Sequence, residues 1–217
     1  MFPTQIRDYV PGIDRQNLGV IFARPEVGKT SFSAWLSGWY VKNKHHVAYW
    51  GNEEPVKKTR MRVAKSITER SRLEVLQDKE GFIDEYQETI LPYISFMDCV
   101  GTSIQEIEDY CSRNEVDVIF IDQLDKIRID GEFSRGDERL KELYCRSREL
   151  AKRHDVAVWA ISQASYDAHG RETIDYSMLD GSKTGKAGEA DIIVGIGVAE
   201  HEEFRTCLLY TSDAADE

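Results

Sequence analysis

The residues Ala23-Arg24-Pro25-Glu26-Val27-Gly28-Lys29-Thr30 (ARPEVGKT) decide the fold of this chain. They fit the pattern GxxxxGK[ST], with alanine in the place of the first glycine. In a loop of this type, successive backbone N–H groups surround phosphate oxygens, and the following helix adds the positive end of its dipole. We therefore expect Lys29 to reach the β- and γ-phosphates of a nucleotide and Thr30 to bind Mg²⁺. The residues expected to line the nucleotide are Ala23, Arg24, Pro25, Glu26, Val27, Gly28, Lys29, Thr30 and Ser31. A coincidental match in an ordinary loop is the alternative.

Strand and helix patterns alternate on both sides of this loop. Short apolar runs predict strands at Leu18–Phe22, Val47–Trp50, Ile94–Met97, Val116–Ile121, Val156–Ser162 and Ile192–Ile196. Helical patterns run from Lys29 through Tyr40, from Pro55 toward Leu76, from Ser103 onward and from Asp137 to His154. Polar loops are expected at Lys126–Gly136 and Gln163–Gly188, the second one long and mobile. Such alternation predicts an α/β fold with a mainly parallel central sheet and helices on both faces.

Polar side chains stand where three of these strands end. Asp122 ends the most apolar strand, so it is placed to hold Mg²⁺ through water at the carboxyl edge of the sheet. A turn or helix-capping aspartate is the alternative. Glu53 and Glu54 follow the Val47–Trp50 strand, and either one is placed to deprotonate an attacking water; a solvated acidic pair opening the next helix is the alternative. Gln163 is placed to sense a γ-phosphate, although a plain polar residue at a strand end fits equally well.

Composition and charge narrow the class of protein. Of the 217 residues, 41% are hydrophobic, and the formal net charge is −11, which argues against broad adhesion to nucleic acid or anionic lipid. Local basic loops stay compatible with that balance. The longest apolar run, Ile192–Ala199, is too short to span a membrane, and the N-terminus shows no secretory signal, so we expect a cytoplasmic protein without a membrane partner.

The last residues, Cys207–Glu217, read CLLYTSDAADE. This stretch resembles the in-frame translation of an adapter used in transposase-based sequencing libraries, and we interpret it as a non-native tail with no domain of its own. A frayed acidic tail is the alternative. On this interpretation the domain comprises residues 1–206 and is incomplete at its C-terminus.

Five motifs taken together resemble one family. ARPEVGKT, VAYWGNEEP, VIFIDQLDKI, WAISQAS and GSKTGKAGEADIIVGIG resemble the RecA-like motor of DnaB-type hexameric replicative DNA helicases, especially phage-type members. The likeness in order and spacing covers roughly residues 10–206. It implies a RecA-like P-loop NTPase fold, with ATP and Mg²⁺ as cofactors and ATP hydrolysis as the activity.

The resemblance also assigns roles to single residues. It implies that Lys29, Glu53 and Gln163 are catalytic, that Thr30 and Asp122 hold Mg²⁺, and that Glu53 rather than Glu54 activates water. It implies a ring of identical subunits, expected to be a hexamer, around single-stranded DNA, with a primase or loader as a further partner. If the gene is phage-borne, the cytoplasm is that of a bacterial host. The candidate DNA-binding residues are Lys126, Arg128, Arg135, Arg139, Lys183 and Lys186.

The chain departs from the family pattern at its ends. The family's arginine finger is expected beyond Thr206, so we expect this chain to hydrolyse ATP only weakly. No primase or helicase-collar domain precedes Met1, which we interpret as an internal start or a genuinely short product. Two other functions stay open. One is a RecA-like recombination or accessory ATPase that binds DNA without unwinding it. The other is a P-loop small-molecule kinase or a nucleotide-binding module.

Overall fold

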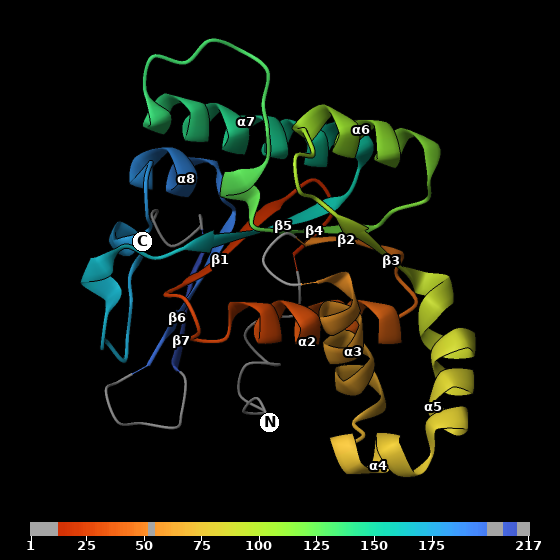
Figure 1. The fold of residues 1–217 in the computed structure, drawn as a ribbon. Helices are drawn as coiled ribbons and strands as arrows, with labels where there is room; N and C mark the ends of the chain where they lie inside the picture. The colour runs from red at the N-terminus through yellow and green to blue at the C-terminus, as the bar shows by residue number, and fades with distance from the viewer. Residues whose placement is uncertain (1–12, 52–54, 199–205, 212–217) are drawn as a thin grey trace.

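A central sheet organises the chain in the computed structural model, which describes residues 13–51, 55–198 and 206–211. The strand order is β3-β2-β4-β5-β1-β6-β7. The first six strands in the chain are parallel: β1 (Leu18–Ala23), β2 (Val47–Gly51), β3 (Ile94–Asp98), β4 (Val118–Asp122), β5 (Ala157–Gln163) and β6 (Ile192–Gly197). Their carboxyl ends therefore meet at one edge, which Figure 1 shows beside the start of α2.

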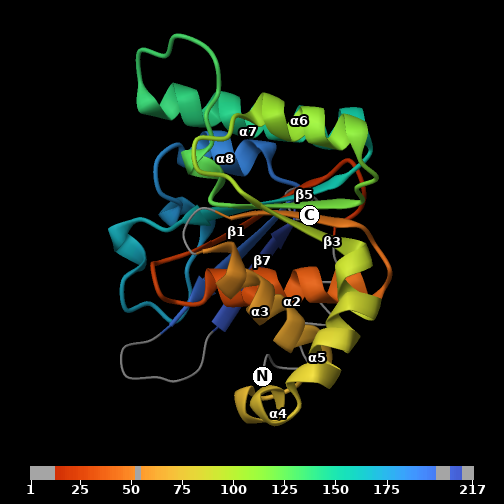
Figure 2. The same cartoon turned by 45° about the vertical axis from the view of Figure 1, so that its right-hand side comes forward.

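Helices cover both faces of this sheet (Figures 1 and 2). On one face lie α6 (Ile104–Arg113), α7 (Gly136–His154) and α8 (Lys183–Glu189). On the other lie α2 (Lys29–Lys42) and α3 (Val56–Thr68), with α4 (Arg72–Gln77) and α5 (Lys79–Glu85) farther from the sheet. The described residues also form one short π-helix, η1 (Tyr86–Ile90), and four 3-10 helices: η2 (Leu91–Tyr93), η3 (Leu124–Lys126), η4 (Tyr166–Ala168) and η5 (Tyr176–Met178). The predicted α/β class with helices on both faces is confirmed.

The sequence of β4 shows why the sheet has two buried faces. Ile119 and Ile121 belong to the hydrophobic cluster that α6 and α7 cover. Val118 and Phe120, which alternate with them, belong to the cluster that α2 and α3 cover. Successive strand residues point to opposite faces, so a run apolar at every position is stable only in a sheet covered on both sides. Asp122 is the polar end of this run.

Two segments differ from the sequence predictions. The single helix expected from Pro55 toward Leu76 is interrupted: α3 ends before Glu69, which adopts a left-handed φ of 57°, and a new helix starts after Ser71. Leu73, in the first turn of that new helix, is 70% exposed. The segment expected as a long loop, 163–188, instead contains η4, η5 and most of α8.

Thr206–Thr211 form β7, which pairs antiparallel with β6, so that Gly197 lies opposite Thr206 and Ile192 opposite Thr211. No strand was predicted here from the sequence. The interpretation of residues 207–217 as a non-native tail is not addressed by this pairing and stays a prediction. Within the described ranges, no helix combines the length and apolar character needed to cross a membrane.

Candidate nucleotide-binding site

The phosphate-binding loop connects the end of β1 to the start of α2. Gly28 immediately precedes the helix with a φ of 120°, and its carbonyl accepts the first helical hydrogen bond from Phe32 N at 2.9 Å. A Cβ atom placed on Gly28 would meet no atom within 4 Å. The backbone conformation, rather than crowding, therefore requires glycine at this position.

Lys29 is held inside the loop by the loop's own backbone. Its side chain is buried, with 4% of the residue exposed. The ammonium Nζ donates to the carbonyl oxygens of Ala23 at 3.1 Å and Arg24 at 3.2 Å. A buried ammonium needs such acceptors, and these carbonyls fix it at the phosphate-binding loop.

A carboxylate from another strand reaches the start of α2. Asp122, at the end of β4, accepts a hydrogen bond on Oδ2 from Thr30 Oγ1 at 3.1 Å. The same oxygen accepts from the phenol of Tyr49 at 3.3 Å, and that phenol also lies 2.7 Å from Ser33 Oγ. Hydroxyl and carboxylate oxygens are the hard ligands that Mg²⁺ takes, so this donor set fits the cation.

Tyr49 supports this carboxylate from β2. Burial, followed by the nearby negative charge of Asp122, raises the pKa of the phenol well above its ordinary value. The phenol therefore stays protonated across the physiological range and remains a hydrogen-bond donor to Asp122. No local sequence pattern points to this role of Tyr49, because its contact with Asp122 joins residues 73 positions apart.

Gln163 lies directly beside the phosphate-binding loop. In the parallel pairing of β1 and β5 it is the partner of Ala23, and Ala164 N donates to Ala23 O at 3.0 Å. The strand-end placement expected for Gln163 and Asp122 is therefore observed. Glu53 and Glu54 lie outside the described residues, but Gly51 pairs with Asp122 in the β2–β4 register.

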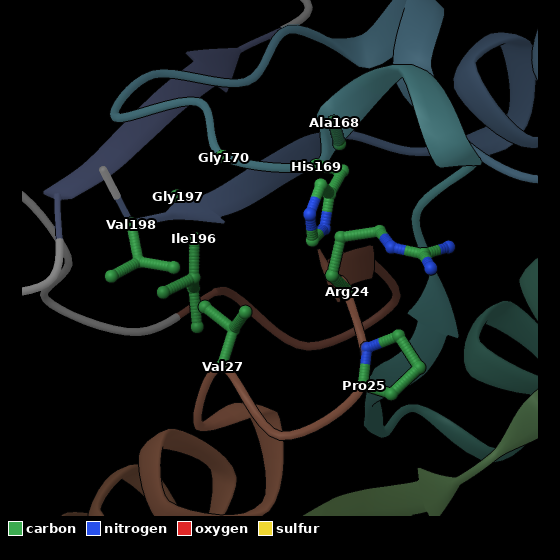
Figure 3. A pocket seen from close by; sticks show the side chains of 9 residues that line it. All are labelled: Arg24, Pro25, Val27, Ala168, His169, Gly170, Ile196, Gly197 and Val198. Carbon is green, nitrogen blue, oxygen red and sulfur yellow. The ribbon is translucent and has the colours of Figure 1, made fainter. Parts of the chain in front are cut away.

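A cavity of about 320 Å³ adjoins the loop on the side of β6. It is lined by Arg24, Pro25, Val27, Ala168, His169, Gly170, Ile196, Gly197 and Val198. In Figure 3, the side chains of Val27, Ile196 and Val198 lie together and the His169 ring lies next to Arg24. An apolar wall next to a phosphate-binding loop suits the less polar part of a nucleotide.

The candidate DNA-binding cations have different surroundings. The side chains of Lys126, Arg128 and Lys183 are exposed. Arg135 is also exposed and forms an ion pair with Asp137 at 2.8 Å.

Two of the candidates are engaged inside the domain. Arg139 donates to the backbone carbonyls of Ile127 at 3.1 Å and Asp125 at 2.7 Å. Lys186 was expected in an exposed loop, yet it is 0% exposed and its ammonium lies 2.7 Å from the carboxylate of Asp125. As placed here, Lys186 is not a surface cation, because α8 packs it against the ends of β4 and β5.

Comparisons with known proteins agree with this geometry. The family model "DnaB-like helicase C terminal domain" matches residues 4–200. The chain belongs to this family. A solved structure described as an ATPase domain matches this helicase domain with a TM-score of 0.74 and 20% identity, over 98% of this chain and 76% of that one. No curated protein matches the sequence.

A second solved structure has the same fold. It is described as "The Structure Of A DnaB-Like Replicative Helicase And Its Interactions With Primase", with a TM-score of 0.72, 20% identity and coverage of 98% of this chain. The helicase domain spans 51% of that longer chain. The predicted RecA-like fold and the predicted DnaB-type family are confirmed, and with them the assignment as an ATP-hydrolysing motor of a replicative helicase.

Proposed function

We propose that this helicase domain binds ATP and Mg²⁺ at the Ala23–Ser31 loop and uses hydrolysis to move along single-stranded DNA and unwind duplex. The observation that carries the proposal is the 3.1 Å contact between Thr30 and Asp122, residues 92 positions apart in the chain. It brings a carboxylate from the end of β4 to the phosphate-binding loop on β1. A phosphate cradle and a carboxylate in contact with its Thr are the arrangement that P-loop ATPases require.

Each of these residues has a distinct task in the proposal. Lys29, held at the loop carbonyls of Ala23 and Arg24, exchanges those acceptors for phosphate oxygens. Thr30 and Asp122 hold the cation, and Tyr49 keeps the Asp122 carboxylate oriented. Bound Mg²⁺ supplies positive charge that offsets the charge on the transferred phosphoryl group.

Glu53 is the proposed general base and Gln163 the proposed γ-phosphate sensor. The β2–β4 register puts Gly51 beside Asp122, so β2 ends at the same edge of the sheet as the proposed Mg²⁺-binding carboxylate. Gln163 pairs with Ala23, the first residue of the loop, which suits contact with a terminal phosphate. A positioned base contributes roughly 10² to 10⁴ in rate.

DNA and partner subunits are the remaining parts of the proposal. Lys126, Arg128 and Lys183 carry exposed cations near the carboxyl edge, which suits phosphates of single-stranded DNA. We further propose that identical subunits form a ring, expected to be a hexamer. A primase or loader as partner and a place in the cytoplasm, that of a bacterial host if the gene is phage-borne, belong to the same proposal.

Hydrolysis assays test this function directly. ATP turnover is measured with and without single-stranded DNA, followed by strand separation on a forked duplex. Glu53→Gln should keep ATP binding and lose turnover by roughly 10² or more, while the matched Glu54→Gln keeps turnover. The reverse result would move the base to Glu54. DNA stimulation without unwinding would favour an accessory ATPase, and no DNA stimulation in the assembled protein would refute the proposal.

A further inference from the structure

A buried lysine contacts three other segments at the carboxyl edge of the sheet. Lys186, on α8, is 0% exposed, and its ammonium lies 2.7 Å from Asp125 Oδ2 on η3. The same ammonium donates to Ser162 Oγ on β5 at 2.9 Å. It also lies 5.3 Å from the centre of the Tyr144 ring on α7. We call these four residues the Lys186 cluster.

Hydrogen bonds fix the acceptor side of the Lys186 cluster. Asp125 Oδ1 accepts from the Tyr144 phenol at 3.0 Å, and Oδ2 accepts from Ser162 Oγ at 2.8 Å. Burial raises the pKa of the Tyr144 phenol well above its ordinary value, so the phenol remains a donor. Arg139 holds the backbone of the same turn by donating to Asp125 O at 2.7 Å. A buried charge is tolerated only in such a fully bonded geometry, so the cluster resists any relative displacement of its members.

The cluster lies between the proposed ATP-sensing residues and a proposed DNA contact. Asp125 lies in η3, just after the end of β4 at Asp122, and Ser162 immediately precedes Gln163. Lys186 lies on the same short helix as Lys183, whose side chain is exposed.

Backbone contacts tie the neighbouring loop to the same strand end. Asp180 N donates to Gln163 O at 3.0 Å, and Ser165 N donates to Met178 O at 2.7 Å. The segment before α8 therefore runs beside the residue proposed to contact the γ-phosphate.

We propose that Lys186 is a positioning residue that couples the nucleotide state at the ends of β4 and β5 to the DNA-facing segment that carries Lys183. The inference rests on the proposed function. A shift of the β4 or β5 end on ATP binding moves Asp125 or Ser162, and the ion pair moves α8 with them. Packed elements of this kind change between discrete arrangements rather than deform continuously. By linkage, ATP then raises affinity for DNA by the same factor by which DNA raises affinity for ATP.

The test measures this factor without depending on hydrolysis. The affinity for fluorescent oligo-dT is determined by anisotropy, with no nucleotide and with a non-hydrolysable ATP analogue plus Mg²⁺. The coupling ratio is the DNA affinity with the ATP analogue divided by the DNA affinity without nucleotide. In the wild-type protein we expect it in the usual range for coupled sites, about 5 to 150. Lys186→Met should bring it close to 1 and leave the affinity for the ATP analogue without DNA unchanged. The matched control Lys152→Met makes the same change at an exposed position near the end of α7 and should keep the wild-type ratio.

A second variant distinguishes the loss of ATP–DNA coupling from a loss of folding stability. Lys186→Met alone leaves the Asp125 carboxylate without its cation, which destabilises the domain. The double variant Asp125→Asn with Lys186→Met removes both charges and should regain a melting temperature near that of wild type, with the ratio still close to 1. A stable double variant with the wild-type ratio overturns the inference alone. A ratio of 1 in the wild-type protein overturns the proposed function as well.

Discussion

Removal of one phenolic hydroxyl, in Tyr49→Phe, tests whether the Asp122 carboxylate is the Mg²⁺ site. The substitution keeps the ring, which stacks on Phe120 at 5.6 Å. It deletes the hydroxyl that donates to Asp122 Oδ2 and that also lies 2.7 Å from Ser33 Oγ. Thr30 Oγ1 then remains as a side-chain donor to that oxygen, so the carboxylate is less firmly oriented.

The structure sets the size of two separate effects. A hydrogen bond to a charged group contributes about 1.5–3 kcal/mol, and the 3.3 Å length of the bond to Asp122 places it at the low end. The contact with Ser33 Oγ is lost as well, so we expect the free energy of unfolding to fall by at least about 1.5 kcal/mol. Loss of a residue that orients a metal ligand reduces metal affinity or activity by about 10- to 100-fold. The Mg²⁺ concentration for half-maximal ATP hydrolysis should therefore rise by about that factor.

The assay is a Mg²⁺ titration of ATP hydrolysis at fixed free ATP, together with urea unfolding of the same preparations. Tyr144→Phe is the matched control, because it also deletes a buried phenol that donates to an aspartate, here Asp125 at 3.0 Å. It should lower stability by a similar amount and leave the Mg²⁺ dependence unchanged. An unaltered Mg²⁺ dependence in a folded Tyr49→Phe protein would show that Asp122 does not hold the cation.

Three further predictions concern single residues. Lys29→Ala should reduce ATP hydrolysis by at least about 10² to 10³ and weaken nucleotide binding, and wild-type turnover in a coupled assay would contradict the assigned role. Gly28→Ala adds no clash but forces alanine to a φ of 120°, so calorimetry should show a loss of about 1–3 kcal/mol in stability; a neutral effect would mean that the loop relaxes. Partial burial, then the charge of Glu108, raises the pKa of the Cys111 thiol to about 12. The thiol should therefore resist iodoacetamide at neutral pH in the folded protein and react after denaturation, as read by mass spectrometry, and rapid labelling of the folded protein would refute the raised pKa.

Local sequence signals account for the elements that were predicted well. The phosphate-binding loop is contiguous, and its lysine bonds to carbonyls only five and six residues away. A helix was predicted from Ser103, and there Ser103 and Glu106 form both reciprocal bonds of a capping box. The continuous apolar run of β4 is typical of a strand covered on both faces, and all five of its residues are buried.

Predictions failed where contacts between distant residues decide the structure. Glycine or proline usually signals the end of a helix in a sequence. At the break of α3 the left-handed position is occupied by Glu69 instead, so no such signal is present in the sequence. The polar segment around Lys186 is typical of an exposed loop, and its burial depends on Asp125, which is 61 residues away. A prediction from neighbouring residues alone treats Lys186 as exposed, because it contains no information about a partner so far away in the sequence.

The same division between local and distant contacts explains how the site is assembled. The loop sequence alone places a lysine against backbone carbonyls. The contact of Thr30 with Asp122 also requires β4 to end level with β5, its neighbour, which in turn pairs with β1. That alignment follows from strand register, which pairs Asp122 with Ile161 and Gln163 with Ala23. A one-residue slip of a strand would turn its side chains to the opposite face and bury them wrongly, so the two-sided core enforces the register. The apolar strands therefore do more than stabilise the fold, because their packing fixes where the carboxylate and the amide meet the phosphate-binding loop.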